Sequence, residues 1–248
     1  MKACANLSTL FSDLPMDERF GAARSAGFRG IEIPFPYDHA VPHLLDRLSQ
    51  NDLDFVMITC PPPNYTGAER GFAAVPGQED RFRRDFTRTM RYAKALGVHH
   101  VHVMSGAVEG PEAYDVLIAN LRWAVTETPH QSLTLEPMCD EDMPGYYLNN
   151  ALKAADIVKE IGAKSLGLQF DVHHIHQIHG DVLEIWEAVG PHVTHIQLAQ
   201  SPARLGPDQE GGVDIKAFLK AVKASGYKGW MSGEYQTDGR GDAHLFWV

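Results

Sequence analysis

The sequence has little of what marks a secreted or membrane-spanning protein. Its three cysteines, Cys4, Cys60 and Cys139, lie far apart and form no CxxC pair, which favours a reducing compartment over a disulfide framework. No window of about 18 apolar residues occurs, so no segment is expected to span a membrane. Met1 to Pro15 lack the continuous apolar stretch of an export signal. We therefore expect a cytoplasmic protein.

Positive charge and phosphate-binding motifs are also scarce. Lys and Arg number 22 against 32 Asp and Glu, which gives a formal net charge of -10. A chain this acidic is a poor partner for nucleic acid or an anionic membrane, because both are bound through clustered Lys and Arg. No GxxxxGK[ST], GxGxxG or serine nucleophile-elbow motif is present. Cys60 ends an apolar run and is a candidate nucleophile, but no paired base is evident, and a small core residue is the alternative.

What the chain does have is a repeated unit, in which a helical pattern ends at glycine and a short apolar strand follows. Gly97 before Val101 and Gly162 before Leu166 are two examples, and glycine is the residue that best tolerates the left-handed end of a helix. The resulting strands are expected near residues 3–7, 30–33, 54–59, 100–104, 132–136, 166–171, 193–198 and 230–234. Helices are expected near 16–26, 40–51, 78–96, 111–126, 148–162, 180–189 and 214–225, with Asp214 as an N-cap.

Eight strands alternating with seven helices predict an α/β fold, a single (β/α)8 TIM barrel, with a doubly wound α/β sheet as the alternative. The length of 248 residues is close to the usual barrel size of about 250, and no linker divides the chain, so residues 1–248 are expected to form one domain. Few residues follow Glu234, and 237–242 read as loop. The last helix is therefore expected to be short or missing.

Four of the predicted strands end on a side chain that carries oxygen: Glu136, Asp171, Gln197 and Glu234. A parallel barrel gathers such ends on one face, where the site is built by the loops that follow. These loops are long after strands 3, 5 and 7. Taken singly, each residue has the simpler explanation that the core meets solvent there, but without a cation the set would leave three buried carboxylates repelling one another. The set predicts a site for a hard divalent cation, Mg²⁺ or Mn²⁺.

Thirteen histidines raise the question of a zinc site. His99, His100 and His102 lie in or beside a strand, where alternate side chains point to opposite faces, so they are not expected to converge. His174 lies three residues after Asp171 and is the histidine expected to contact substrate. His176 and His179 are expected on a solvated loop.

The motifs together resemble the hydroxypyruvate isomerase family, close to the 2-oxo-tetronate isomerases, within the xylose-isomerase-like barrels. The resemblance runs nearly end to end and is carried by Ala5-Asn-Leu-Ser8, Phe35-Pro-Tyr37, Gly67-Ala-Glu-Arg-Gly71, Glu136-Pro137, Asp142-Met-Pro-Gly-Tyr146, Gln169-Phe-Asp171, His195-Ile-Gln197 and Gly233-Glu-Tyr235. It implies aldose-ketose isomerisation of a small hydroxy-oxo acid, hydroxypyruvate or a 2-oxo-tetronate, through an enediolate. Glu136 and Glu234 would then be both metal ligands and the acid/base pair, with Asp171 and Gln197 completing the ligand set.

An acidic substrate implies a cationic clamp, for which Arg70 and Arg204 are the loop arginines expected. The chain departs from the family in its substrate loops. His173 stands where the family usually has an aromatic residue, and the loop Ala199-Gln-Ser-Pro-Ala-Arg-Leu-Gly-Pro207 lacks an Asp, a His and a Glu. These departures make the substrate less defined than the reaction.

Three alternatives stay open. A keto-sugar 3-epimerase would use the same two glutamates on an uncharged sugar. A relative that repairs abasic DNA would need a three-zinc cluster with more histidines at strand ends, and it conflicts with the net charge of -10. A non-catalytic metal- or sugar-binding barrel is compatible with the altered loop after strand 7. The resemblance also suggests a homodimer or homotetramer.

Overall fold

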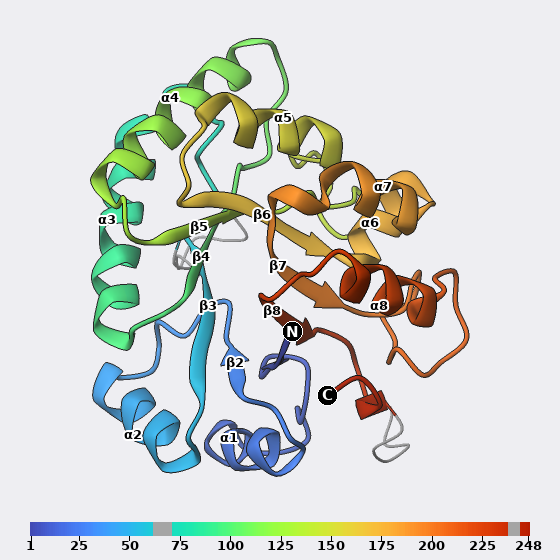
Figure 1. Cartoon of the computed structure of the whole chain (residues 1–248). Coiled ribbons are helices and arrows are strands. Elements are labelled where there is room, and N and C mark those ends of the chain that lie inside the picture. The colour runs from blue at the N-terminus through green and yellow to red at the C-terminus, as the bar shows by residue number, and fades with distance from the viewer. Residues whose placement is uncertain (62–70, 238–243) are drawn as a thin grey trace.

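A computed structural model describes residues 1–61, 71–237 and 244–248, and in it eight parallel strands close into a barrel in chain order. β8 pairs with β1 in parallel register, Cys4 lying opposite Ser232. The predicted TIM barrel is therefore confirmed, and the doubly wound sheet is wrong, because that sheet stays open (Figure 1). The strands are β1 (Lys2–Asn6), β2 (Gly30–Glu32), β3 (Asp54–Cys60), β4 (His100–Val103), β5 (Ser132–Leu135), β6 (Leu166–Asp171), β7 (Val193–Leu198) and β8 (Trp230–Gly233).

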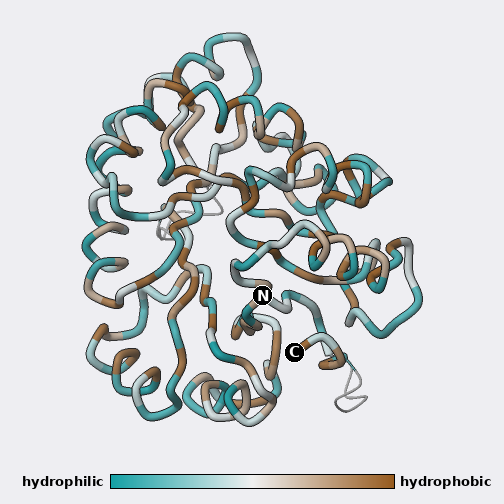
Figure 2. Tube along the Cα trace, in the orientation of Figure 1, coloured by the Kyte–Doolittle hydropathy of each residue, from teal (hydrophilic) through white to brown (hydrophobic). Residues whose placement is uncertain are grey.

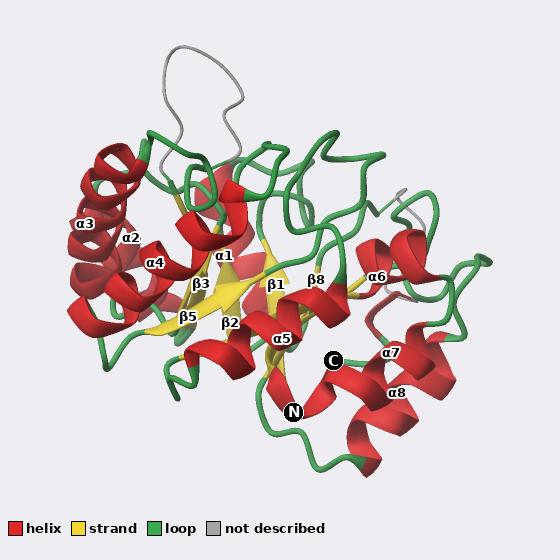
Figure 3. Ribbon diagram, turned by 90° about the horizontal axis from the view of Figure 1, so that it is seen from above, coloured by secondary structure: helices red, strands yellow, loops and turns green. Residues whose placement is uncertain are grey.

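The helices surround this barrel (Figure 3). They are α1 (Met16–Ser25), α2 (Val41–Asn51), α3 (Glu79–Leu96), α4 (Glu112–Glu127), α5 (Ala151–Ile161), α6 (Val172–His179), α7 (Val182–Val189) and α8 (Ile215–Ala224), with a 3-10 turn η1 (Gly190–His192) before β7. Gly97 and Gly162 end α3 and α5 in the left-handed conformation, as their sequence positions predicted. Asp214 caps α8 by accepting a hydrogen bond from the Ala217 amide at 2.9 Å. No helix in the described ranges is long and apolar enough to cross a membrane.

Helix α6 was not expected from the sequence. The side chain of Asp171 caps it, accepting a hydrogen bond from the His174 amide at 3.1 Å. The prediction that His176 and His179 lie on a solvated loop is wrong, since both belong to α6 and are partly buried. His176 Nδ1 lies 2.9 Å from Ser201 Oγ, and His179 Nε2 accepts a hydrogen bond from the Ala151 amide. Histidine has only weak helix propensity, and these tertiary contacts outweigh it.

Strand side chains alternate between the helices and the barrel interior. Those facing outward are apolar: Phe170 stacks on Phe218 of α8 at 5.6 Å and meets Trp186 of α7 edge-on at 5.4 Å. Along the surrounding helices, hydrophobic and hydrophilic residues alternate (Figure 2), so each helix buries one face and exposes the other. The outward side chains thus fix the helices to the barrel.

The inward side chains form an apolar floor with polar layers above it. Trp230, Cys4, Val56 and Met57 make a small buried cluster at the floor. Gly30 leaves the room for it, because a Cβ there would lie 2.5 Å from Val56 and 2.8 Å from Trp230. Above the floor the buried inward residues are polar: Asn6, Glu32, Thr59, His102, Thr134, Gln169, Asp171, His195, Gln197 and Ser232. A polar interior that opens at the carboxyl ends of the strands prepares that face for a site.

The chain ends without a long helix after β8. Within the described residues only a short turn at 244–247 follows that strand, in agreement with the expectation of a short or missing last helix. Tyr235 anchors this turn: its buried hydroxyl accepts a hydrogen bond from Trp247 Nε1 at 3.3 Å and lies 2.9 Å from His244 Nδ1. Trp247 packs edge-on against Phe28 at 5.8 Å. The last residues thus pack back against the start of the chain.

Candidate active site

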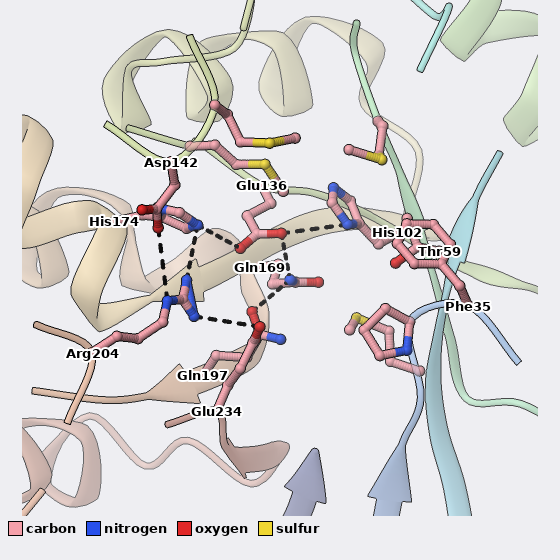
Figure 4. A pocket seen from close by; sticks show the side chains of 15 residues that line it. Phe35, Thr59, His102, Glu136, Asp142, Gln169, His174, Gln197, Arg204 and Glu234 are labelled. Carbon is pink, nitrogen blue, oxygen red and sulfur yellow. Dashed lines mark hydrogen bonds and ion pairs between the residues drawn. The ribbon is translucent and has the colours of Figure 1, made fainter. Parts of the chain in front are cut away.

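A pocket of about 290 Å³ opens at the carboxyl ends of the strands. This volume is at the small end of the range for ligand sites. Its lining combines apolar and polar side chains (Figure 4). The apolar part is formed by Pro34, Phe35, Met57, Met104, Met138 and Met143. The polar part is formed by Thr59, His102, Glu136, Asp142, Gln169, His174, Gln197, Arg204 and Glu234.

The four residues predicted as metal ligands come together here. Glu136 directly follows β5, Asp171 ends β6, Gln197 is the penultimate residue of β7, and Glu234 directly follows β8. Glu136, Gln197 and Glu234 line the pocket, and Asp171 is buried beside it. Because β5 to β8 are neighbours in the barrel, residues far apart in sequence become adjacent at one edge.

Arg204 and His174, two of the three predicted substrate residues, also line the pocket, whereas Arg70 lies outside the described residues. Arg204 reaches in from the loop after β7 and donates a hydrogen bond from its terminal NH2 group to Asp171 Oδ2 at 2.8 Å. The same NH2 lies 3.0 Å from His174 Nε2, and its NH1 lies 3.4 Å from Glu234 Oε1. The guanidinium therefore lies among the carboxylates (Figure 4).

Burial and mutual repulsion set the charges of these carboxylates. Burial, together with the charges of Asp171 and Glu234, raises the pKa of Glu136 well above its usual value. Burial also raises the pKa of Glu234 to about 8, although Arg204 opposes the rise. For Asp171 burial acts in the same direction, but Arg204 and His174 outweigh it, and the pKa is lowered. At neutral pH the site therefore combines one ionised carboxylate with two that hold protons readily, which suits proton transfer.

A chain of amides fixes the orientation of Gln197. Its Nε2 donates a hydrogen bond to Glu32 Oε1 at 2.8 Å, and its Oε1 accepts one from Gln169 Nε2 at 2.7 Å. Gln169 Nε2 also donates to Glu136 Oε2 at 2.7 Å. Glu32 in turn lies 2.7 Å from His195 Nε2 and accepts from Asn6, all three being fully buried. The nitrogen of the Gln197 amide is held by the Glu32 carboxylate, so the amide oxygen must point away from Glu32. Glu32 thereby directs Gln197 Oε1 toward Glu136 and the pocket.

His102 also lines the pocket, although the sequence did not predict it as a site residue. It is buried, and its Nδ1 lies 3.4 Å from Glu136 Oε2. Burial lowers its pKa to about 3, so the ring is neutral at physiological pH. The sequence of β4 contained an indication of this position. Side chains of a strand alternate between its two faces, so His100 and His102 share one face, and that face is the barrel interior. Asp142, Gln169 and Glu32 were also missed as site residues, because their roles depend on tertiary neighbours.

Neither cysteine near a strand end has the character of a nucleophile. Burial raises the pKa of Cys60 to about 12, and its place in the hydrophobic core agrees with a packing role. Burial, with added repulsion from Asp142 and Glu141, also raises the pKa of Cys139. Thiolate catalysis therefore has no support here.

The residues present suit a divalent cation. Glu136, Asp171 and His174 each offer one ligand atom within 4.8 Å of the other two, and Gln197 and Glu234 add oxygens at the same pocket. Burial is the main cause of the raised pKa values of Glu136 and Glu234, and repulsion from neighbouring carboxylates adds to it, even with Arg204 nearby. A cation would remove this repulsion. The structure therefore contains a possible metal-binding group of carboxylate and histidine ligands.

Comparison with known proteins agrees with this geometry. The model of the xylose isomerase-like TIM barrel family matches residues 20–245. The chain is 34% identical to the 2-oxo-tetronate isomerase of Cupriavidus necator, over 98% of this chain and 96% of that one, and 30% identical to the hydroxypyruvate isomerase of Escherichia coli, over 100% and 98%.

A crystal structure of a protein from Brucella melitensis, described as an AP endonuclease of family 2, superposes with a TM-score of 0.92 at 34% identity, covering 99% of this chain and 97% of that one. Closed barrel, clustered strand ends and full-length similarity lead to one conclusion. This chain belongs to the hydroxypyruvate isomerase and 2-oxo-tetronate isomerase family of xylose isomerase-like TIM barrels.

Proposed function

We propose that this protein isomerises a small hydroxy-oxo acid, hydroxypyruvate or a 2-oxo-tetronate, between its ketose and aldose forms. The observation that carries the proposal is that Glu136 and Glu234, both with raised pKa values, point into one pocket that also holds Arg204 (Figure 4). The names of the two relatives, a 2-oxo-tetronate isomerase and a hydroxypyruvate isomerase, support the same substrate class.

The two glutamates suit the proton transfer that the reaction requires. One carboxylate takes the proton from the hydroxyl-bearing carbon beside the carbonyl, and the resulting enediolate receives a proton on the former carbonyl carbon, from the same or the other carboxylate. The hydroxyl proton moves to the former carbonyl oxygen, so that atoms and charge balance. Positioned carboxylates of this kind contribute on the order of 10² to 10⁴ in rate.

Glu136, Asp171, Gln197 and Glu234 are the residues that would hold a Mg²⁺ or Mn²⁺ ion. Such an ion supplies polarisation of the substrate carbonyl and stabilises negative charge on its oxygen. Oxygen ligands select these hard cations over thiophilic ones.

Arg204 supplies the clamp for the substrate carboxylate. Its guanidinium holds several donors in a planar fork, the geometry that carboxylates bind best. The apolar part of the lining favours a short acid over a sugar, because Pro34, Phe35 and Met104 offer no partners to the hydroxyl groups of a longer polyol. The small pocket volume and the guanidinium of Arg204 together support an acid of three or four carbons.

Incubation with hydroxypyruvate or a 2-oxo-tetronate in deuterated buffer tests the proposal. Turnover should place deuterium on the carbon that receives the transferred proton, as read by NMR. If none of these acids is converted or exchanges its proton in the presence of Mg²⁺ or Mn²⁺, the proposal is wrong.

The proposal includes a cytoplasmic setting and a small-molecule partner, with assembly as a homodimer or homotetramer. The net charge of -10 gives no support to DNA as a ligand. Binding to an abasic DNA duplex at low salt would contradict this part of the proposal. Light scattering of the purified protein tests the assembly.

A further inference from the structure

A second cluster of metal-ligand side chains lies beside the pocket, at its outer edge. Cys139 and Asp142 come from the loop after β5, and His173 and His174 from the first turn of α6. One ligand atom from each of the four residues lies within 4.8 Å of all the others. β5 and β6 are paired neighbours, so the barrel brings the two short segments together.

We propose that Cys139, Asp142, His173 and His174 bind one zinc-type divalent cation. This site shares no residue with the ligand set Glu136, Asp171, Gln197 and Glu234 of the proposed isomerase reaction and goes beyond that reaction, and His174 lies between the two sites. Sulfur, imidazole nitrogen and one carboxylate form a donor set typical of Zn²⁺, whereas the strand-end site is rich in oxygen. The two sites should therefore select different metals.

The spacing of the donors agrees with a tetrahedral ion. With bonds of about 2.0 to 2.3 Å, a tetrahedral zinc site separates its ligand atoms by about 3.3 to 3.8 Å. Cys139 Sγ lies 3.1 Å from His174 Nδ1, His173 Nε2 lies 3.1 Å from Asp142 Oδ2, and His174 Nδ1 lies 3.8 Å from the same oxygen. The remaining pairs of donor atoms lie within 4.8 Å of each other, so shifts of up to about 1 Å would complete the geometry.

Burial and access also fit a bound ion. Cys139, His173 and His174 are almost completely buried, at 1%, 2% and 4% exposure, so the chain holds their donor atoms in place. The Asp142 side chain is 42% exposed and gives the cluster a route to solvent. His173, which replaces the aromatic residue expected from the family resemblance, supplies its Nε2, 3.1 Å from Asp142 Oδ2, as one of the four donors.

His174 connects this cluster to the pocket. Its Nδ1 faces Cys139 and Asp142, while its Nε2 faces Arg204 at 3.0 Å and Glu136 at 3.8 Å (Figure 4). A cation on Nδ1 would leave the proton on Nε2. Arg204 can only donate, so this proton would be donated to Glu136, and the Arg204 NH2 group would move away from the ring. The second site would thereby fix both the orientation and the tautomer of a ring that faces the substrate.

Cobalt titration of the metal-free full-length protein tests the proposal. Co²⁺ bound through Cys139 should produce a thiolate-to-cobalt charge-transfer band that saturates at about one equivalent per chain. Zn²⁺ should abolish the band by displacing Co²⁺, and excess Mg²⁺ should leave it unchanged. Cys139→Ala should eliminate the band, whereas Cys60→Ala, the matched change at a core cysteine, should retain it.

Zinc affinity provides a second measurement. Loss of an outer-sphere partner costs a metal site about 10- to 100-fold in affinity, so loss of a direct ligand in Cys139→Ala or His173→Phe should cost at least about 100-fold. Circular dichroism establishes that each variant is folded, and the phenylalanine preserves most of the ring volume. A band that survives Cys139→Ala, or its absence from folded, cobalt-treated wild-type protein, would overturn the second site.

Glu234→Gln separates this proposal from the isomerase proposal. That variant should lose proton exchange in hydroxypyruvate and keep the thiolate band. A wild-type protein that isomerises the acid without the band would refute only the second metal site. A wild-type protein with the band and no isomerisation would refute only the reaction.

Discussion

Arg204 donates a hydrogen bond to Asp171 at 2.8 Å, and this contact places a guanidinium between the carboxylates at the mouth of the barrel. The carboxylates in turn raise the pKa of Arg204, against the effect of its burial, so its charge is permanent. Arg204 is therefore positioned both to compete with a cation for Asp171 and Glu234 and to bind the carboxylate of a substrate.

Arg204→Ala should change these two affinities in opposite directions. Loss of a charge-assisted hydrogen bond costs about 1.5 to 3 kcal/mol, so KM for hydroxypyruvate should rise about 10- to 100-fold. Affinity for Mn²⁺ should increase by at least about 10-fold, because a positive charge is removed from the site. Calorimetry and steady-state kinetics measure the two effects.

Arg84→Ala, a change at an exposed position of α3, is the matched control and should alter neither value. An unchanged KM in Arg204→Ala would show that this guanidinium does not bind the substrate. If an uncharged ketose is converted equally well by wild type and Arg204→Ala while the acid is not a substrate, the keto-sugar 3-epimerase alternative gains support.

Cation affinity at the strand-end site should depend on pH. Glu234 has a pKa raised to about 8 and must lose its proton to become a ligand. Below pH 8 the Glu234 proton competes with the metal, and this proton alone should make Mn²⁺ affinity rise up to about 10-fold per pH unit between pH 6 and 8, with the proton of Glu136 adding to the slope. In Glu234→Gln the dependence of Mn²⁺ affinity on pH should become less steep, because only the Glu136 proton still competes with the metal. An unchanged dependence would mean that a group other than Glu234 causes it.

Glu32 should stabilise the fold and orient the pocket from beneath. It accepts hydrogen bonds from Asn6 and Gln197 and lies 2.7 Å from His195 Nε2, all in the barrel interior. Glu32→Ala leaves these buried polar groups without their partner, at about 1 to 3 kcal/mol for each one unsatisfied. We expect the free energy of unfolding in urea to fall by about 3 kcal/mol or more.

Exposed Glu187 of α7 provides the comparison, and Glu187→Ala should stay within about 0.5 kcal/mol of wild type. The milder Glu32→Gln keeps the side-chain volume but lets the Gln197 amide turn over. It should weaken Mn²⁺ binding about 10- to 100-fold, as loss of an outer-sphere partner does. Equal metal binding in Glu32→Gln and wild type would mean that Gln197 is not a ligand.

Glu136→Gln and Glu234→Gln should each reduce kcat by about 10² to 10⁴, because an amide cannot carry the transferred proton. The protein should remain folded, since the volume is conserved and the repulsion between buried carboxylates decreases. Stopped proton exchange in deuterated buffer is the direct readout. Glu141→Gln, an exposed change in the loop after β5, is the control, and a similar loss there would point to loop damage instead of chemistry.

The barrel was predictable because its signals are local. Alternation of apolar strands with amphipathic helices, and glycine at helix ends such as Gly97 and Gly162, located each predicted strand and helix within a few residues. α6 was not expected because it depends on a cap at Asp171 and on contacts of His176 with Ser201 and of His179 with the first residue of α5. Such contacts leave little trace in the neighbouring sequence.

The sequence by itself determined which oxygen-bearing side chains lie at the strand ends. Once β5 to β8 are parallel neighbours, Glu136, Asp171, Gln197 and Glu234 must meet at one edge, because strand direction and pleat fix where each side chain points. Only the tertiary structure decided what surrounds them. Placement of Arg204 on Asp171, of Glu32 beneath Gln197, and of Cys139 against His174 depends on loop conformation and on burial, and these arise from the packing of the whole chain.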